Sequence, residues 1–346
     1  MNNRRKLLVA LGAGAFATPL AVKRRRKLLI AIGGALAAPL ATFGQKQPRV
    51  WRIGFLAADS SSTGIYEGFR QGMRELGYVE GKNFIIQWRF ADGKYERLPG
   101  LAAELVRLNA DVIVAGTTLS VQAAHQATTT IPIVMVAVPD PVGEGFVARL
   151  SRPGGNITGL SNIVTEVSAK HLELLRAAVR KLSRVAVLIN PLNPSDSLIL
   201  EQIHGAAYSA GVKILPVEAS TASQIEAGFG AMTRARTEAL IVAADSHFDV
   251  QRDQIARLAV KNRLPAISSN REMTEAGGLL SYGQDLAEHY RRAATYVDKI
   301  LKGAKPGDLP VEQPTMLQLI INRKTAKAIG LTIRQELMLR ADKVIE

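Results

Sequence analysis

The chain has 346 residues, of which 47% are hydrophobic, 21% are charged and none is cysteine. The lack of cysteine in the sequence excludes a disulfide framework and a lipid anchor on an N-terminal cysteine. The formal net charge is +14, and it falls to +6 when the eight Lys and Arg of residues 1–45, a stretch without acidic residues, are set aside. Beyond that stretch the sequence contains no run of five like charges and no basic stripe interleaved with aromatic residues, so its composition argues against nucleic-acid binding.

Residues 1–44 read as an export signal written twice. Arg4-Arg5-Lys6 precedes an apolar run over 7–22, and Arg25-Arg26-Lys27 precedes another over 28–43. A basic start, a short apolar run and small residues before a polar exit are typical of a secretory signal. Each apolar run has 16 residues, fewer than the roughly 20 that cross a bilayer, so a hairpin of two membrane helices is the less favoured alternative. We predict that the leader is removed and that the mature protein is soluble in the periplasm; the paired arginines permit a twin-arginine route as well as a general secretory one.

From residue 51 onward, apolar runs of strand length alternate with helix-length segments. The first series predicts strands over 52–58, 83–90, 111–115, 131–137 and 157–160, and helices over 63–77 and 95–108. A second series starts with a helix that follows Thr165 and ends at Leu182. It continues with strands over 184–189, 212–217, 239–243 and 265–268, and with helices over 196–210, 222–236 and 249–262. The tail predicts a strand over 278–283, a helix over 286–302, a turn over 303–307, an extended segment over 309–321 and short helices over 322–330 and 334–339.

This alternation predicts the fold class. Near-continuous apolar strands between amphipathic helices are typical of parallel sheets covered on both faces. Two such series predict an α/β fold with two doubly wound parallel-sheet lobes rather than one large sheet. A single strand and helix in the tail cannot form a lobe, so we expect the chain to return to the first lobe and cross back, which makes a three-strand hinge. The predicted division is a leader over 1–44, lobe 1 over 45–157 plus 283–307, and lobe 2 over 158–282 plus 308–346.

Sequence signals for catalysis or cofactor binding are weak. Residues 143–148 have the spacing of a dinucleotide-binding fingerprint, but they follow the fourth predicted strand rather than the first, after an intervening Pro-Asp-Pro. The five histidines form no i, i+4 pair, and the sequence has neither a Gly-x-Ser-x-Gly elbow nor a phosphate-binding Gly-x-x-x-x-Gly-Lys-Ser/Thr loop. We therefore predict no cofactor, no metal site and no enzymatic activity.

Small polar residues follow the carboxyl ends of the predicted strands, where ligands bind in open α/β sheets. Such residues also serve as helix caps and turn formers, but their presence in six loops favours a binding cleft. The candidate ligand-binding residues are Asp59, Ser60, Tyr66, Thr117, Thr118, Asp140, Asn190, Asp245, Phe248, Asn270 and Tyr282.

Chemistry suggests roles for several of these candidates. Asp59 or Asp245 would pair with a ligand ammonium, and Thr117 and Ser60 would hold a carboxylate together with backbone N–H groups at a helix start. Tyr66 or Phe248 would stack on an aromatic ring, with a core position as the alternative for Phe248. Asp140 has a helix cap as its alternative role, and Tyr282 lies at a predicted crossover, where it would sense closure.

Six segments together resemble one protein family. They are 78–81 (YVEG), 95–99 (YERLP), 127–132 (ATTTIP), 140–143 (DPVG), 152–160 (RPGGNITGL) and 294–303 (ATYVDKILKG). From about Val50 to Glu346 the chain resembles the ABC-transporter substrate-binding proteins of the tryptophan/tyrosine-transport type, which have the periplasmic-binding-protein type I fold. Some of these relatives bind aromatic amino acids in the cleft.

The resemblance implies a venus-flytrap mechanism, in which a small solute bridges two lobes and closure presents a surface to a membrane permease. The permease and its ATPase would be separate chains, the only membrane contact would be through the permease, and the binding protein would be a monomer. An amino acid or an aromatic or carboxylate compound is the favoured solute. Two alternatives stay open: a sensory module that reports ligand occupancy to a receptor, and an α/β enzyme, for which the sequence offers no coupled acid–base site.

Overall fold

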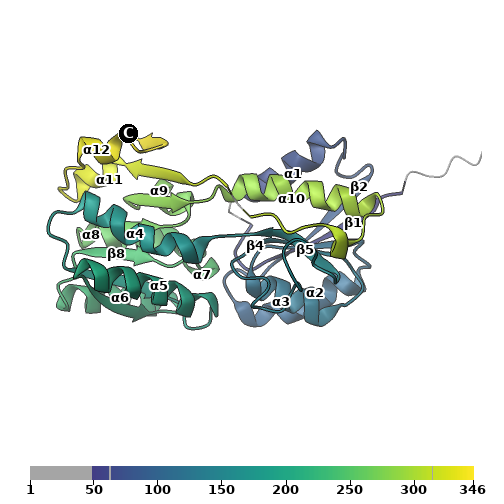
Figure 1. Ribbon diagram of the computed structural model, residues 1–346, viewed down its shortest axis with the longest axis horizontal. Coiled ribbons are helices and arrows are strands. Elements are labelled where there is room, and N and C mark those ends of the chain that lie inside the picture. The colour runs from purple at the N-terminus through teal and green to yellow at the C-terminus, as the bar shows by residue number, and fades with distance from the viewer. Residues whose placement is uncertain (1–48, 62–63, 314) are drawn as a thin grey trace, which may run out of the picture. The chain divides into compact units, whose positions relative to one another are not determined.

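A computed structural model describes residues 49–61, 64–313 and 315–346, all of which belong to one compact unit that spans 47–346 (Figure 1). The predicted leader lies outside the described residues, so its two signal-like halves stay a prediction. Within the described ranges, no helix is both long enough and apolar enough to cross a membrane.

The first sheet has five parallel strands in the order β2-β1-β3-β4-β5 (Figure 1). Neighbouring residues of its strands enter different cores: Phe55 joins one buried cluster and Leu56 the other, because successive side chains of a strand point to opposite faces. Helices α1 and α10 cover the first face, and α2 and α3 cover the second. The bounds are β1 Trp51–Ala57, β2 Phe84–Phe90, β3 Val112–Ala115, β4 Ile133–Val138, β5 Ile157–Ser161, α1 Tyr66–Glu75, η1 Tyr95–Arg97, α2 Leu98–Arg107, α3 Thr118–Ala127 and α10 Leu286–Leu301.

The second sheet has seven strands in the order β12-β11-β10-β9-β8-β6-β7. All of its pairings are parallel except that of β10 with β11. Its strands are β6 Arg184–Ile189, β7 Lys213–Glu218, β8 Ala239–Val242, β9 Ala266–Ser268, β10 Leu280–Gly283, β11 Gln318–Asn322 and β12 Lys343–Ile345. Its helices are α4 Val164–Ala178, α5 Ser195–Ala210, α6 Ala222–Arg234, α7 Ser246–Val250, α8 Arg252–Lys261, α9 Arg271–Glu275, α11 Arg323–Ala328 and α12 Gln335–Met338.

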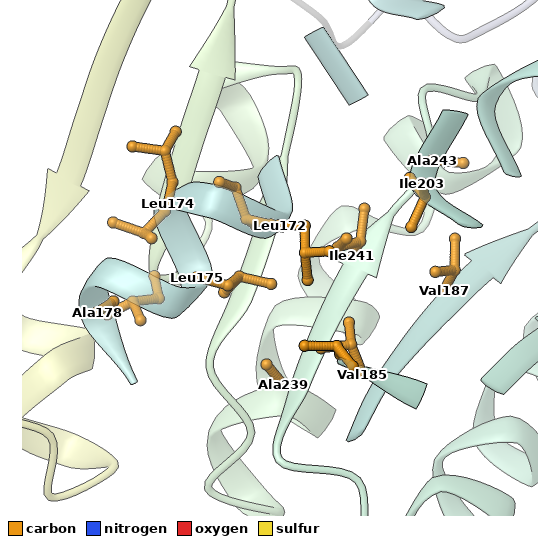
Figure 2. Packing of buried hydrophobic residues seen from close by; sticks show 14 of the residues in the cluster. Leu172, Leu174, Leu175, Ala178, Val185, Val187, Ile203, Ala239, Ile241 and Ala243 are labelled. Carbon is orange, nitrogen blue, oxygen red and sulfur yellow. The ribbon is translucent and has the colours of Figure 1, made fainter. Parts of the chain in front are cut away.

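The core of this sheet is also two-sided. Figure 2 shows Leu172 and Leu175 of α4 on the side of the helix that faces β6 and β8, toward Ile241 and Val185. Ala186 and Leu188, which alternate with the valines of β6, face a separate cluster supplied by α6 and α8. The predicted class, an α/β protein with two doubly wound sheets, is confirmed by this arrangement.

Three connections join the two sheets. The chain leaves the first sheet after β5, and it returns after β10 to form α10, which packs beside α1 and β4. After α10 the chain runs along β5 once more. There the Thr158 hydroxyl donates to the Leu309 carbonyl (2.7 Å) and the Glu312 N–H donates to the Gly159 carbonyl (3.0 Å). We propose that the lobes divide after Ser161, after Gly283 and between Glu312 and Gln318. The boundaries expected from the sequence, at 157/158, 282/283 and 307/308, stay predictions.

Several elements differ from their sequence-based expectations. The helix expected over 249–262 is two helices, α7 and α8, with Gln251 between them, and the helix after Thr165 ends at Ala178 because Val179 is extended (φ −107°, ψ 123°). Of the extended segment expected over 309–321, only 318–321 belongs to a strand, β11, which continues to Asn322. The final strand β12 was not expected, since a three-residue strand carries little periodic signal.

The buried leucines of α4 allow a test of the core. Leu175→Ala should lower the free energy of unfolding by about 2–5 kcal/mol, because a fully buried leucine loses its contacts and leaves a cavity. Urea titration followed by circular dichroism measures the change. Leu339→Ala is the matched control: that side chain is 79% exposed, and its truncation should stay within about 0.5 kcal/mol of wild type. Equal effects of the two substitutions would contradict the packing in Figure 2.

Candidate functional site

A cavity of about 120 Å³ lies where the strands of both sheets end. Its walls include segments that follow β1, β3, β4 and β5 in the first sheet and β6, β8, β9 and β10 in the second. Carboxyl ends of parallel strands are the place where α/β sheets bind ligands, because the loops there diverge and helix starts point inward. The segments in question include 58–59, 116–119, 137–139, 244–246, 269–270 and 283–284.

Some predicted ligand-binding residues line this cavity and others do not. The lining includes Asp59, Tyr66, Thr117, Thr118, Asp245 and Asn270. The residues outside the lining are Ser60, Asp140, Asn190, Phe248 and Tyr282. The ligand roles of both groups stay predictions, and only the first group enters the proposal below.

The residues outside the lining have other contacts. Phe248 is 1% exposed and belongs to the core beneath α6 and α8, which is the alternative that its sequence position left open. Asp140 is exposed, and its carboxylate accepts the Gly143 N–H (2.8 Å), so it caps a turn. Tyr282 is half-buried, and its backbone carbonyl lies 2.7 Å from Nε2 of His171. Buried Asn190 supports Asp245, as described next.

Asp245 accepts several hydrogen bonds at the cavity wall. Its Oδ1 accepts from the Asn190 amide (3.1 Å) and from the His247 N–H (2.9 Å). Its Oδ2 accepts from the Tyr95 hydroxyl (2.5 Å) and from the Asn193 amide (3.1 Å). A carboxylate has about four acceptor positions, so Asp245 is already committed. It caps α7 and joins the two sheets, and a ligand ammonium would have to displace one of these donors.

The side chain of Tyr95, which belongs to the first sheet's half of the chain, contacts Asp245 of the second sheet's half. Burial and the neighbouring Asp245 carboxylate raise the pKa of Tyr95, which keeps its hydroxyl protonated as a donor. The backbones also approach closely beside this bond: a Cβ added at Gly93, which has φ +74°, would lie 3.2 Å from Nδ1 of His247. Glycine at this position permits the approach.

Asp249 was not a predicted site residue, yet it lines the cavity. Both of its carboxylate oxygens lie 2.8 Å from the Asn270 amide nitrogen. Burial raises its pKa to about 8, against the lowering effect of the Asn270 bond and with further raising by the charges of Asp59, Glu272 and Asp245. One turn of helix separates Asp249 from Asp245, and residues at i and i+4 share a helix face. This spacing is the sequence signal that would have found it.

The first sheet contributes an aromatic wall. The Tyr66 and Tyr290 rings meet edge to face with centroids 5.0 Å apart, and both side chains line the cavity. Phe55 supports Tyr66 from behind, with ring centroids 5.1 Å apart. The Tyr66 hydroxyl donates to the Asp59 carboxylate, and burial raises the pKa of Tyr290 well above its usual value. Tyr290 comes from α10, so only the return of the chain to the first sheet brings it here.

A further carboxyl group, that of Asp196, is buried behind the cavity wall. Asp196 is 2% exposed, and its Oδ2 accepts the Asn190 N–H (2.6 Å). Its Oδ1 has no hydrogen-bond partner. Burial and the nearby charge of Asp245 raise the pKa of Asp196 to about 8, so it is protonated at neutral pH.

Three further features of the described chain concern metal binding, the buried His171 and the fingerprint-like segment. No cluster of three or more His, Asp or Glu that could hold a metal ion occurs among the described residues. Burial lowers the pKa of His171 to about 4, so this histidine is neutral and donates to the Tyr282 carbonyl. Residues 143–148 form turns rather than the helix start that a dinucleotide fingerprint requires.

Comparison with known proteins places these features in context. The family model described as ABC transporter substrate binding protein matches residues 53–345. A tyrosine-binding protein of Clostridioides difficile (strain R20291) is 28% identical over 265 residues, which are 77% of this chain and 76% of that protein. The structure of an ABC domain from Streptococcus pneumonia in complex with L-Trp is 26% identical, has a TM-score of 0.78 and covers 86% of this chain and 100% of that chain. The ligand-free, open structure of a substrate-binding protein with adhesive properties from Clostridium difficile is 25% identical, with a TM-score of 0.61 and coverage of 86% and 99%.

The bond between Tyr95 and Asp245 predicts a conformational effect. Tyr95→Phe should weaken the connection between the two sheets by about 1.5–3 kcal/mol, because it removes a donor to the Asp245 carboxylate. Small-angle X-ray scattering should then give a larger radius of gyration than for wild type. Tyr78→Phe is the matched control, since the Tyr78 hydroxyl donates to Asp298 of α10 (3.0 Å) within the first core. An unchanged radius for Tyr95→Phe would contradict this role.

The buried Asp196 carboxyl predicts a pH dependence of stability. Its pKa is about 8 in the folded chain and 3.8 without burial, so between these values the folded state binds more protons than the unfolded state. Stability contributed at this site therefore falls as pH rises from about 4 to 8, by up to about 1.4 kcal/mol per pH unit. Asp196→Asn should remove this loss and should raise the unfolding midpoint more at pH 8 than at pH 5. Asp253→Asn, an exposed change on α8, should alter neither midpoint; an equal gain at both pH values for Asp196→Asn would refute the assignment.

Proposed function

Since this chain belongs to the family of ABC transporter substrate-binding proteins and captures a solute for an ABC transporter, we propose that its solute is an L-amino acid with an aromatic side chain. The observation that carries the proposal is one cavity that offers acidic groups, a helix start and an aromatic wall together. Such a combination matches the ammonium, the carboxylate and the ring of one small molecule.

The α3 helix start supplies the carboxylate side of the proposal. Thr117 is the N-cap, its hydroxyl accepts the Ser120 N–H (3.3 Å), and Thr118 and Leu119 line the cavity in the first turn. First-turn N–H groups have no partner within their helix, and they carry partial positive charge. Together with the Thr118 hydroxyl, they form a suitable site for a carboxylate.

The aromatic wall supports the choice of side chain. Tyr66 and Tyr290 both line the cavity, and aromatic pairs contribute about 0.5–1.5 kcal/mol beyond the burial of their area. Relatives of this chain include a tyrosine-binding protein and a protein crystallised with L-Trp. Both observations favour an aromatic L-amino acid over a sugar.

A closed state of the binding protein is part of the proposal. The chain superimposes better on the L-Trp complex than on the ligand-free, open relative, with TM-scores of 0.78 and 0.61. The hydrogen bond from Tyr95 to Asp245 supports the same state, because it joins the two sheets beside the cavity. Closure around the solute would present the recognition surface to the permease.

Members of this family work outside the cytoplasm with a membrane permease. For this chain we propose a periplasmic location, a permease and an ATPase as separate chains, and a monomeric binding protein. The duplicated signal-like segment of the sequence and the lack of cysteine support this location.

The proposal predicts selective stabilisation by aromatic amino acids. Protein that has been unfolded and refolded to release carried-over ligand is heated with L-Trp, L-Tyr, L-Phe, L-Leu or D-glucose. A ligand at 100 times its dissociation constant adds about 2.7 kcal/mol, so the aromatic amino acids should raise the midpoint by several degrees and glucose should not. A shift with glucose alone would overturn the proposal.

Two N-caps provide a matched pair of variants for the same experiment. Thr117→Val and Thr221→Val each remove a side chain that caps a helix, at α3 and α6, and each should lower stability by about 1 kcal/mol. Only Thr117 lines the cavity, so only its variant should also weaken L-Trp binding, by roughly tenfold or 1.4 kcal/mol. Equal affinities of the two variants for L-Trp would show that Thr117 does not contribute to ligand binding.

A further inference from the structure

The cavity lining has acidic side chains and no basic ones among the described residues. The acidic side chains are those of Asp59, Asp245 and Asp249. Carboxylates gathered in a partly buried space repel one another and lose hydration. A bound ligand that carries a cation would relieve both effects, whereas an anion would add to them.

The three carboxyl groups differ in their capacity for a further donor. Asp245 already accepts from Tyr95, Asn190, Asn193 and α7 N–H groups. Asp59 accepts the Tyr66 hydroxyl. The hydrogen bonds to the Asp249 carboxylate both come from a single nitrogen, Nδ2 of Asn270. Because a carboxylate takes about four donors, Asp249 retains acceptor positions beside the cavity.

Among the described residues, the charged groups that act on the Asp249 carboxylate are all acidic. Asp59 approaches from the segment after β1, Asp245 from the same helix and Glu272 from α9, and all three raise its pKa. Tyr290 faces it from α10 as a neutral phenol. The nearest basic contact is that of Arg252, whose guanidinium binds the Asp249 backbone carbonyl (2.8 Å) rather than the carboxylate.

We infer that Asp249 is the counter-ion for a cationic amine of the ligand and that it sets the specificity of the cavity for amines over otherwise identical acids. This inference rests on the proposed function and deepens it, because it names the residue that recognises the ammonium group of the solute. It also replaces the expectation that Asp59 or Asp245 pairs with the ammonium: Asp59 accepts the Tyr66 hydroxyl, Asp245 joins the two sheets, and Asp249 binds the amine of the ligand.

Proton release accompanies binding under this inference. The Asp249 carboxyl, with a pKa of about 8 in the free protein, is mostly protonated at pH 6, and the ammonium requires it as a carboxylate. One proton therefore leaves Asp249 for the solvent as the amine binds. Affinity should rise by up to tenfold per pH unit between pH 6 and 8.

The test compares ligands with and without an amine. Isothermal titration at pH 7 measures L-Trp and 3-(indol-3-yl)propionic acid, which lacks only the amine, against wild type, Asp249→Asn and Asp253→Asn. Wild type and the exposed control Asp253→Asn should prefer L-Trp by at least a hundredfold. Asp249→Asn should lower this preference to a few-fold, because the amide keeps the shape and the Asn270 contact while losing the charge.

A second measurement needs no variant. Titration of wild type with L-Trp at pH 6 in buffers of different ionisation enthalpy counts the protons released, and the expected value approaches one. An unchanged preference in folded Asp249→Asn, or no proton release in wild type, overturns this inference and leaves the proposed function standing. A wild type that binds no L-amino acid at all overturns the proposed function itself.

Discussion

The cavity depends on the carboxylate of Asp245. It lies at the start of α7, where it caps the helix, receives the amides of Asn190 and Asn193, and accepts the hydroxyl of Tyr95 from the other sheet. A buried carboxylate is tolerated only when donors replace its water. The same donors therefore stabilise the charge, orient the loop over 190–193 and connect the two sheets. Removal of any donor would leave acceptor capacity unsatisfied on the cavity wall.

Acidic groups around this centre have distinct functions because their surroundings differ. Asp196 lies behind the wall with one oxygen unpartnered, and its raised pKa keeps it neutral. Asp249 faces the cavity one helical turn from Asp245, with a raised pKa and a single amide partner. A chain with a net charge of +14 thus has an acidic cavity, so overall charge says little about the solute.

The three crossings of the chain decide which side chains meet. β5 and β10 end at the cavity before the chain changes sheet, and α10 brings Tyr290 back to stand beside Tyr66. Residues distant in sequence therefore form one aromatic wall of the cavity, which the helix start at Thr117 also lines. In such a fold, a ligand that touches both sheets is favoured by the closed arrangement, and the two events are thermodynamically linked.

Sequence by itself determined the α/β class, the two series of strands and the edge of the sheets where polar residues collect, because side-chain periodicity and turn residues are local signals. It also identified Asp59, Tyr66, Thr117 and Asp245 as cavity-edge positions. Only the tertiary structure decided which polar groups are already satisfied, since hydrogen bonds such as Tyr95 to Asp245 join residues 150 positions apart. The tertiary structure also decided that Phe248 lies in the core and that Asp249 lines the cavity. The direction of a short helix is set by packing against distant elements, and no local sequence pattern records that packing.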